Sequence, residues 1–271
     1  MDKISFVILT WNSEKVIAQC LESIAASDLS SYEIIIVDNG STDKTRDLIN
    51  DFTEKFPAAE VKKVWLEKNY GTTISRNIGI NKSAEDTKYI CILDSDTVIN
   101  REAMEKLIEV LEDNPLNAIS GPAMVNLENE PQITAKKIPT ALIKICKAFP
   151  VRSIQKIGEH KEQYDFSDNL RSYPAGYLIS ACWMIRKESM DKIGLLDENI
   201  FYSPEDVEYC VRAWQKGFRV IYCPRAKIIH ATQRISKKKL ISRHNWEHAK
   251  GLFYFFNKYG LFFNSDKIVC K

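Results

Sequence analysis

The 271-residue sequence lacks several patterns that would place it quickly in a class of proteins. Its longest apolar runs, such as Ile4 to Leu9 and Tyr89 to Leu93, are far shorter than the ~20 residues that a membrane span requires. Because a strand-like run already begins at Ile4, there is no room for a charged leader followed by an apolar signal core. We therefore expect a cytoplasmic protein with no membrane span.

Cysteine pairs and glycine-rich phosphate loops are also missing. The seven cysteines are odd in number and form no C-x-x-C pair, which argues against a disulfide framework and a structural zinc cluster. We expect reduced, mostly buried thiols. Neither G-x-G-x-x-G nor G-x-x-x-x-G-K-[ST] occurs, so the loops typical of dinucleotide-binding proteins and P-loop enzymes are absent from the sequence.

The charged residues are unevenly distributed along the chain, although the net charge is only +2. Residues 1–135 carry 13 Lys and Arg against 23 Asp and Glu, whereas residues 136–161 carry seven against one and residues 234–271 nine against two. Two basic patches predict an anionic partner or surface. We expect no nucleic-acid partner, because the first half is acidic and the chain contains no nucleic-acid-binding motif.

Apolar periodicity predicts four strand–helix units in succession. The strands are expected at residues 4–10, 33–38, 61–66 and 89–93, each followed by apolar residues at helical spacing. This repetition indicates the α/β class, with a parallel sheet covered by helices on both faces. The later elements follow a less regular pattern, with strands predicted at 118–125, 177–185, 219–223 and 227–230 and helices at 205–214 and 236–259.

Polar residues follow each of the four strands at its carboxyl end, which is where open α/β sheets bind ligands. Turn formation and helix capping would explain each of these segments equally well on its own. The segments are Thr10-Trp11-Asn12, Asp38-Asn39-Gly40-Ser41-Thr42-Asp43, Asn69-Tyr70-Gly71 and Asp94-Ser95-Asp96.

Asp94 and Asp96 differ from the other segments because they directly follow a buried strand. Two carboxylates at the end of a hydrophobic core are costly unless a positive charge is bound beside them. A divalent cation that is shared with a diphosphate would supply that charge. The alternative is a solvated turn in which Asp96 caps a helix.

Three later positions carry weaker signals. Glu205 and Asp206 begin a predicted helix, where a carboxylate could act as a general base or merely compensate the helix dipole. His230 ends an apolar strand, a place where histidine is more often structural than a ligand. Trp183 could form an apolar platform for a bound ligand or lie in the core.

The ordered set of these segments resembles the family 2 glycosyltransferases of GT-A fold. The resemblance runs from residue 4 to about residue 233 and looks closest to bacterial members that build O-antigen and capsule, including rhamnosyltransferase-like branches. The segments that carry it are VILTWNSE, IIIVDNGSTD, NYGTTISRNIGI, ILDSD, ACWMIRK, GLLDENIFYSPEDVEYCVRAWQKGFRVIY and IIH.

The resemblance implies a Rossmann-like, mostly parallel central sheet flanked by helices. It implies a domain over residues 1–233, with a nucleotide-sugar-binding half at 1–98 and an acceptor-binding half at 99–233. Residues 234–271 would then form a basic, aromatic, helical C-terminal extension.

The resemblance also implies an activity and roles for single residues. The activity is inverting transfer of a sugar from a UDP-, dTDP- or GDP-linked donor to a saccharide or lipid-diphosphate-linked acceptor in cell-surface polysaccharide synthesis. Asp206 would be the catalytic base and Glu205 its acidic neighbour and alternative, while Asp96, Asp94 and His230 would hold Mn²⁺ or Mg²⁺. The implied donor-binding residues are Thr10, Asn12, Glu14, Asp38 at the base, Asn69, Gly71 at a close backbone approach, Arg76, Asn77 and Asp94.

Two other functions stay open at this point. His244-Asn245-Trp246-Glu247-His248 matches the H-x-x-E-H zinc element of a metallopeptidase class, although Asp266 is the only acidic side chain after it. A module that binds polysaccharide or lipid without chemistry would keep the fold and make Asp206 dispensable.

Residues 140–149 and 237–259 combine lysines with apolar and aromatic residues. They predict peripheral contact with an anionic membrane surface or a lipid-diphosphate acceptor. The alternative is a set of solvated lysines over a packed aromatic core.

Overall fold

The first third of the chain forms the predicted strand–helix units. The computed structural model describes residues 2–164, 170–231, 243–265 and 268, and of residues 243 and 244 the backbone alone. Its first four strands are parallel, as the sequence predicts, and the structure places them in the spatial order β3-β2-β1-β4. The elements are β1 (Ile4–Thr10), α1 (Ile17–Ala25), β2 (Tyr32–Asp38), α2 (Thr45–Lys55), β3 (Val61–Trp65), α3 (Thr72–Ile80), β4 (Tyr89–Asp94) and α4 (Arg101–Glu112).

The rest of the sheet is mixed. One strand, β11, is antiparallel to both of its neighbours, and the sheet continues as β4-β11-β6-β12-β5. The two predicted strands at 219–223 and 227–230 are one strand with a register shift between Cys223 and Lys227. The later strands are β5 (Thr97–Val98), β6 (Asn117–Val125), β7 (Pro131–Gln132), β8 (Ala135–Lys136), β9 (Tyr173–Pro174), β10 (Tyr177–Leu178), β11 (Cys182–Arg186) and β12 (Arg219–His230).

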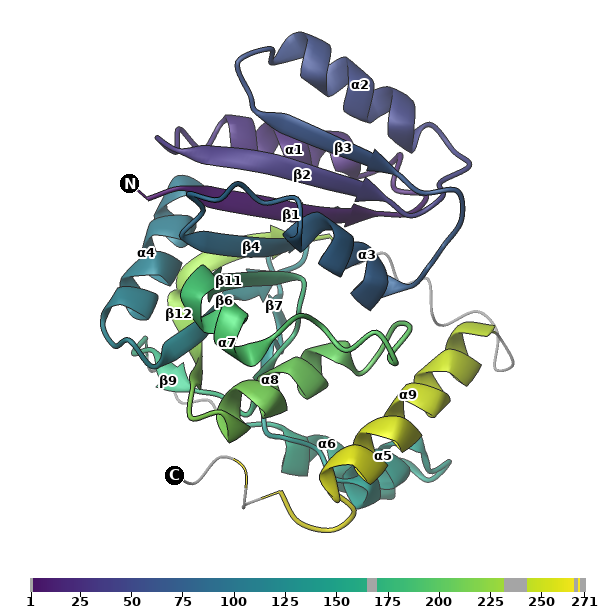
Figure 1. The fold of residues 1–271 in the computed structure, drawn as a ribbon. Helices are drawn as coiled ribbons and strands as arrows, with labels where there is room; N and C mark the ends of the chain where they lie inside the picture. Colours follow the sequence, from purple (N-terminus) through teal and green to yellow (C-terminus); the bar gives the residue numbers. More distant parts are fainter. Residues whose placement is uncertain (1, 165–169, 232–242, 266–267, 269–271) are drawn as a thin grey trace.

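Helices cover both faces of this sheet (Figure 1). The predicted strand at 177–185 is interrupted, because β10 at residues 177–178 pairs with β8 and residues 179–181 link it to β11. The last helix begins at residue 243 in the described part of the chain, and the predicted start at residue 236 lies outside the described residues. The later helices are α5 (Ala141–Ala148), α6 (Arg152–Glu162), α7 (Lys187–Ile193), α8 (Glu205–Gln215) and α9 (Arg243–Tyr259).

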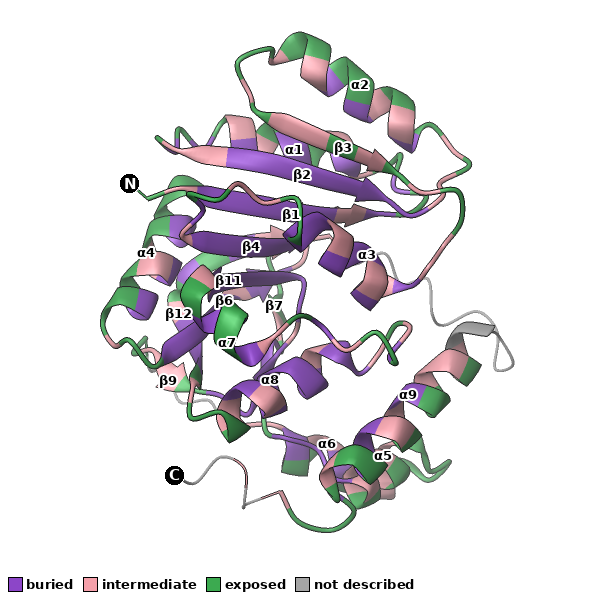
Figure 2. Cartoon of the chain, in the orientation of Figure 1, coloured by how far each residue is buried: buried purple, intermediate pink, exposed green. Residues whose placement is uncertain are grey.

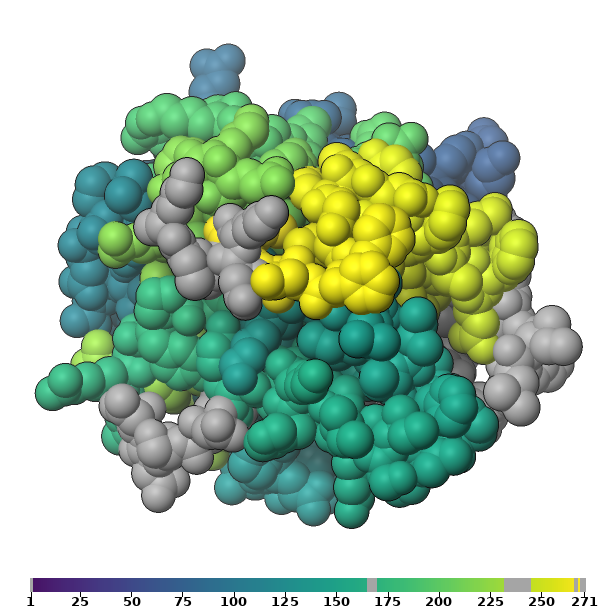
Figure 3. All heavy atoms as spheres, turned by 90° about the horizontal axis from the view of Figure 1, so that it is seen from below, coloured from purple at the N-terminus to yellow at the C-terminus, as the bar shows by residue number. Residues whose placement is uncertain are grey.

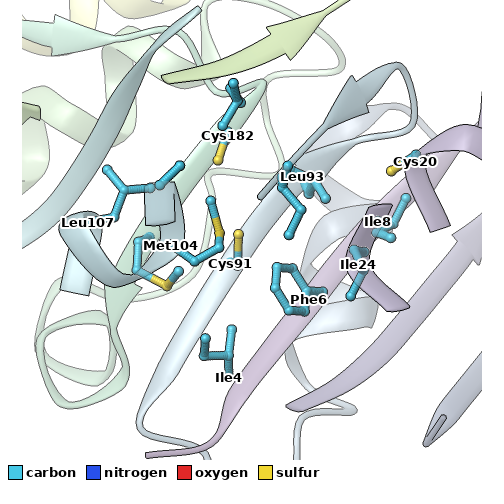
Figure 4. Packing of buried hydrophobic residues seen from close by; sticks show 14 of the residues in the cluster. Ile4, Phe6, Ile8, Cys20, Ile24, Cys91, Leu93, Met104, Leu107 and Cys182 are labelled. Carbon is cyan, nitrogen blue, oxygen red and sulfur yellow. The ribbon is translucent and has the colours of Figure 1, made fainter. Parts of the chain in front are cut away.

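Two hydrophobic layers hold the helices to the sheet, one on each face. Alternate residues of β1 serve both layers, because Phe6 and Ile8 pack with α1, α2 and α4 while Val7 packs on the side of α3, α7 and α8. Figure 4 shows Phe6, Ile8 and Leu93 in the first layer. Full burial of each such side chain contributes about 1.5–3 kcal/mol, which explains why β1, β2 and β4 are buried along most of their length (Figure 2).

The C-terminal helix α9 is anchored to α8 and to the loop before it. The Lys258 Nζ atom lies 2.5 Å from the Asp197 carboxylate and 2.9 Å from that of Glu208. Phe255 is fully buried in the second hydrophobic layer. Helix α9 therefore packs against α8 and the second hydrophobic layer.

The described cysteines are all free thiols, and apart from Cys146 they are buried. This confirms the expectation of reduced, mostly buried thiols for every cysteine except Cys270, which lies outside the described residues. Among the described residues, no helix is both long enough and apolar enough to cross a membrane.

Candidate active site

Asp94, Asp96 and His230 meet at the carboxyl edge of the parallel strands. One ligand atom from each of the three lies within 4.8 Å of the others, and the Asp96 Oδ1 atom is 3.4 Å from His230 Nε2. Asp94 ends β4 and His230 ends β12, which lies three strands away in the sheet. The sheet therefore brings together the three residues that the sequence predicted as metal ligands.

The His230 ring is oriented by Gln132, a residue that the sequence analysis did not single out. His230 Nδ1 lies 2.8 Å from the Gln132 Oε1 atom, and the Gln132 Nε2 group donates to the His230 carbonyl oxygen at 2.8 Å. Because an amide oxygen only accepts, Nδ1 must carry the proton, and the Nε2 lone pair faces Asp96. The sequence gives no sign of this role for Gln132, because its segment belongs to no motif. The folded chain brings Gln132 to His230 through the pairing of β7 with the sheet.

The donor set of this cluster fits a divalent cation. Carboxylate oxygens and a neutral imidazole nitrogen suit Mn²⁺, and the oxygens also suit Mg²⁺. Desolvation raises the pKa of Asp94, Asp96 raises it further, and Arg76 opposes the rise. Burial alone would lower the pKa of His230, but Asp96 raises it overall, which shows the negative potential that a cation would meet.

Arg76 connects this cluster to the carboxylates of α8. Its guanidinium is buried and donates to Asp94 Oδ1 at 2.7 Å and to Glu205 Oε1 at 3.4 Å. Ser180, just before β11, accepts from Arg76 at 2.9 Å and lies 3.0 Å from the same Glu205 oxygen. Because β11 is antiparallel, its beginning lies at the carboxyl edge of β4, an arrangement that a prediction of parallel strands could not reveal.

Glu205 and Asp206 are adjacent but have different surroundings. Glu205 is buried and held by Arg76 and Ser180, and burial together with Asp206 raises its pKa. Asp206 is partly exposed, and its Oδ1 atom accepts from the backbone N–H of Val207 at 2.8 Å. Burial raises the pKa of Asp206, while that N–H and the charge of Lys136 oppose the rise.

Thr10 and Asp38, predicted on the donor side, lie next to each other at the ends of β1 and β2. The Asp38 carboxylate is fully buried and accepts from Thr10 Oγ1 at 3.0 Å, from Arg46 Nε at 2.6 Å and from the Ser41 N–H at 3.1 Å. The Arg46 guanidinium in turn lies over the half-exposed Trp65 ring at 5.5 Å. Contact of Asp38 with a nucleobase therefore requires Arg46 to move, and the role stays a prediction.

Asn12 and Glu14 are exposed and join the loop after β1 to the turn after β2. The Asn12 Oδ1 atom accepts from the Thr42 N–H at 2.9 Å, and the Glu14 carboxylate accepts from the Lys44 N–H at 3.2 Å. Asn12 also has a positive φ of 50°, a conformation that asparagine tolerates better than most residues. Their predicted contact with a donor stays a prediction.

Asn69 and Gly71 shape the turn before α3. Asn69 Oδ1 accepts from the Gly71 N–H at 2.9 Å and from the Asn39 side chain at 3.0 Å. Gly71 has φ of 91°, and a Cβ atom there would lie 2.3 Å from the Phe201 carbonyl oxygen. The predicted close backbone approach at Gly71 is real, but the approaching group is the loop before Asp206.

Two predicted contacts are wrong. Asn77 is buried, and its amide group binds Leu196 N–H and O and the Glu198 carboxylate, so it fastens the 196–198 loop and does not face a donor. Trp183 is fully buried, stacks on Tyr209 at 5.8 Å and donates to the Leu178 carbonyl oxygen. It therefore belongs to the core and cannot form a platform for an acceptor sugar.

The H-x-x-E-H segment forms no metal-binding group within the described residues. The group of potential ligands found there is Asp94, Asp96 and His230. The side chain of His244 lies outside the described part, and Glu247 contacts Lys250 at 3.4 Å. This segment lies on α9, whose Phe255 and Phe256 pack in the second hydrophobic layer.

The sequence of this chain is similar to those of several bacterial glycosyltransferases. The chain is 27% identical over 229 residues to dTDP-rhamnosyl transferase RfbF of Shigella flexneri, covering 83% of this chain and 68% of that protein. It is 20% identical over 240 residues to N-acetylglucosaminyl-diphospho-decaprenol L-rhamnosyltransferase of Mycobacterium tuberculosis, covering 84% and 76%. A shorter match of 34% over 122 residues covers only 28% of poly-beta-1,6-N-acetyl-D-glucosamine synthase of Staphylococcus epidermidis.

Solved structures share the fold. GalNAc-T7 with UDP, GalNAc and Mn²⁺ is 16% identical with a TM-score of 0.73, covering 95% of this chain and 48% of that one. The mannosyltransferase PcManGT of Pyrobaculum calidifontis with GDP-Man and Mn²⁺ is 15% identical with a TM-score of 0.64, covering 95% and 64%. This chain thus spans less than two thirds of either structure. Since residues 5–194 also match the model of glycosyl transferase family 2, the chain belongs to that family and has the GT-A fold.

Proposed function

We propose that the protein transfers a sugar, with inversion at the anomeric carbon, from a nucleoside diphosphate donor to an acceptor hydroxyl. Family membership identifies the chain as a glycosyltransferase enzyme, so the metallopeptidase and the binding-only alternatives are set aside. The observation that carries the finer proposal is the bridge of Arg76 between Asp94 and Glu205. This bridge links a potential metal cluster to the carboxylates at the start of α8.

Asp206 is the proposed general base, and Glu205 is its support. Asp206 is the carboxylate of the pair with exposed surface, and nearby lysines counteract the rise of its pKa. It accepts the proton of the acceptor hydroxyl while the acceptor oxygen forms a bond to the anomeric carbon. The bond from that carbon to the diphosphate oxygen breaks, and the nucleoside diphosphate departs with its electron pair.

Asp94, Asp96 and His230 would hold the divalent cation, Mn²⁺ or Mg²⁺. When bound, such a cation neutralises charge on the departing diphosphate. Gln132 keeps the His230 Nε2 lone pair directed at the cluster, and Arg76 keeps Asp94 in place. Gln132 and Arg76 therefore hold the proposed metal ligands in place for the donor diphosphate.

The substrate classes follow from the relatives as part of the proposal. We propose a dTDP-linked deoxyhexose as the first donor to test, with UDP- and GDP-linked sugars beside it. The proposed acceptor is a saccharide or a lipid-diphosphate-linked saccharide of cell-surface polysaccharide synthesis in the cytoplasm. The domain boundaries at residues 98 and 233 are part of the same proposal.

The variant Asp206→Asn should lose sugar transfer but keep donor binding. We expect this variant to lose about 10²–10⁴-fold in turnover with Mn²⁺ while the donor still raises its melting temperature. Asp191→Asn, an exposed carboxylate on α7, is the matched control and should turn over normally. Wild-type turnover in Asp206→Asn would refute the base, and donor stabilisation that is unchanged by chelation of divalent cations would refute the metal site.

A further inference from the structure

Helix α5 exposes apolar side chains to solvent. None of its residues is buried, and Leu142 and Ile145 on the helix and Phe149 just after it are exposed at helical spacing. Ile145 is 61% exposed. A helix on the surface of a globular protein ordinarily buries its large apolar residues. The exposed apolar face of α5 therefore indicates a binding surface.

The two lysines of α5 point inward. Lys144 lies 2.6 Å from the buried Glu162 carboxylate, Lys147 pairs with the other oxygen of that group, and Tyr177 donates to it at 2.7 Å. Burial alone would raise the pKa of Glu162, but the two lysines and Tyr177 hold it at about 2. The predicted use of Lys144 and Lys147 for contact with anionic lipid is therefore wrong, because both serve this internal cluster.

The apolar face continues beyond α5 on both sides. Val151, at the start of α6, is exposed, and Phe263 from the segment after α9 is 83% exposed. That segment is tied to α5, since the Leu142 N–H donates to the Phe262 carbonyl oxygen at 3.2 Å. Figure 3 shows the teal part of the chain, which includes α5 and α6, beside the yellow residues that begin at α9. The hairpin surface consists of Leu142, Ile145, Phe149, Val151, Phe262 and Phe263.

Basic residues border this surface. Lys156 and Lys161 of α6 are exposed, and residues 136–161 contain one acidic residue, Glu159, which lies 3.1 Å from Arg152. A hollow of about 400 Å³ lies between α5 and Phe263, with Lys161 among the residues that line it. Apolar side chains with lysines around them match the interface of an anionic bilayer, where acyl chains lie below phosphate groups.

We propose that the hairpin surface docks the protein on an anionic phospholipid bilayer. Docking is a function separate from sugar transfer and does not depend on it. It would present the acceptor side to the membrane, because α5 lies close enough to Asp206 for the charge of Lys144 to act on that carboxylate. The residues at 237–242 of the second predicted membrane segment lie outside the described part, and Phe255 and Phe256 of that segment are core residues.

Vesicle flotation tests the proposal. The full chain should float with phosphatidylcholine vesicles that contain phosphatidylglycerol, and less with phosphatidylcholine alone or at high salt. The double variant Ile145→Ser with Phe149→Ser should lose about tenfold or more in partitioning. Leu127→Ser is the matched control, since Leu127 is also 61% exposed but follows β6 on another part of the surface.

Two further variants keep the test decisive. Lys156→Gln with Lys161→Gln should weaken flotation on anionic vesicles by about tenfold and reduce its salt dependence. Phe263→Ser tests the same surface without any change in α5. Absence of wild-type flotation, or equal flotation of the Ile145→Ser with Phe149→Ser variant, overturns the proposal. A wild-type dimer that this variant dissociates would show a second copy on the surface and would overturn it as well.

Discussion

The proposed donor half, residues 1–98, and the proposed acceptor half, residues 99–233, are built in different ways. Among residues 1–94, four strands pair in parallel in the order β3-β2-β1-β4, and a helix follows each of β1, β2 and β3 directly. In the later part, β11 is inserted antiparallel between β4 and β6, and α9 returns from the end of the chain to contact α8. Local patterns dominate the first half, whereas contacts between distant segments dominate the second.

The difference is clearest at the loop from Phe201 to Ser203, which precedes Asp206. Gly71 of the donor half leaves room for the Phe201 carbonyl oxygen on one side of this loop. Gly251 of α9 does the same for the Ser203 carbonyl oxygen, which would lie 2.1 Å from a Cβ atom at that position. The proposed base is therefore positioned by two segments that are 180 residues apart in the sequence.

The largest effect is expected when Arg76, which links Asp94 to Glu205 across the two halves, is replaced. Arg76→Met should destabilise the protein by about 3–5 kcal/mol, because it leaves Glu205 and Asp94 without their buried partner. Urea unfolding measures this loss. The unpaired carboxylates should have raised pKa values, so the variant should regain stability as the pH falls and they become neutral. Arg101→Met, an exposed ion pair on α4, should change stability by less than about 1 kcal/mol.

The internal cluster around Glu162 should lose its stabilising effect as the pH falls. The folded pKa of Glu162 is about 2, below its ordinary value of 4.5, so ionised Glu162 stabilises the protein above about pH 4.5. Glu162→Gln should cost roughly 3 kcal/mol at neutral pH, and its difference from wild type should shrink as the pH falls toward 2. Glu159→Gln on the same helix is the control. A difference that does not depend on pH would contradict the ion-pair assignment.

The smallest effect is expected at Gly251. A glycine-to-alanine change inside a helix ordinarily stabilises by up to about 1 kcal/mol. Gly251→Ala should instead destabilise by about 1–3 kcal/mol, because the new methyl group meets the Ser203 carbonyl oxygen. Thermal unfolding measures the sign, and Lys250→Ala on the exposed side of α9 is the control. A stabilised Gly251→Ala would show that α9 does not press on this loop.

The sequence predicted most of the donor half and much of the site. Buried strands give continuous apolar runs, and polar residues at their ends mark the edge where ligands bind, so β1, β2, β4 and the pair Asp94 and Asp96 could be identified. His230 and Asp206 were found through the order of motifs. Asn77 and Trp183 were misassigned, because motif position does not show which way a side chain points.

By itself, the sequence determined the α/β class, the succession of strand–helix units along the chain and the carboxylates that could hold a cation. The tertiary structure alone decided which of those groups meet, because the antiparallel β11 brings Ser180 to Arg76 and β7 brings Gln132 to His230. It also decided that the α5 lysines face inward while Leu142 and Ile145 face solvent. Periodicity identifies the two faces of a helix, but only packing against the buried Glu162 determines which face meets solvent.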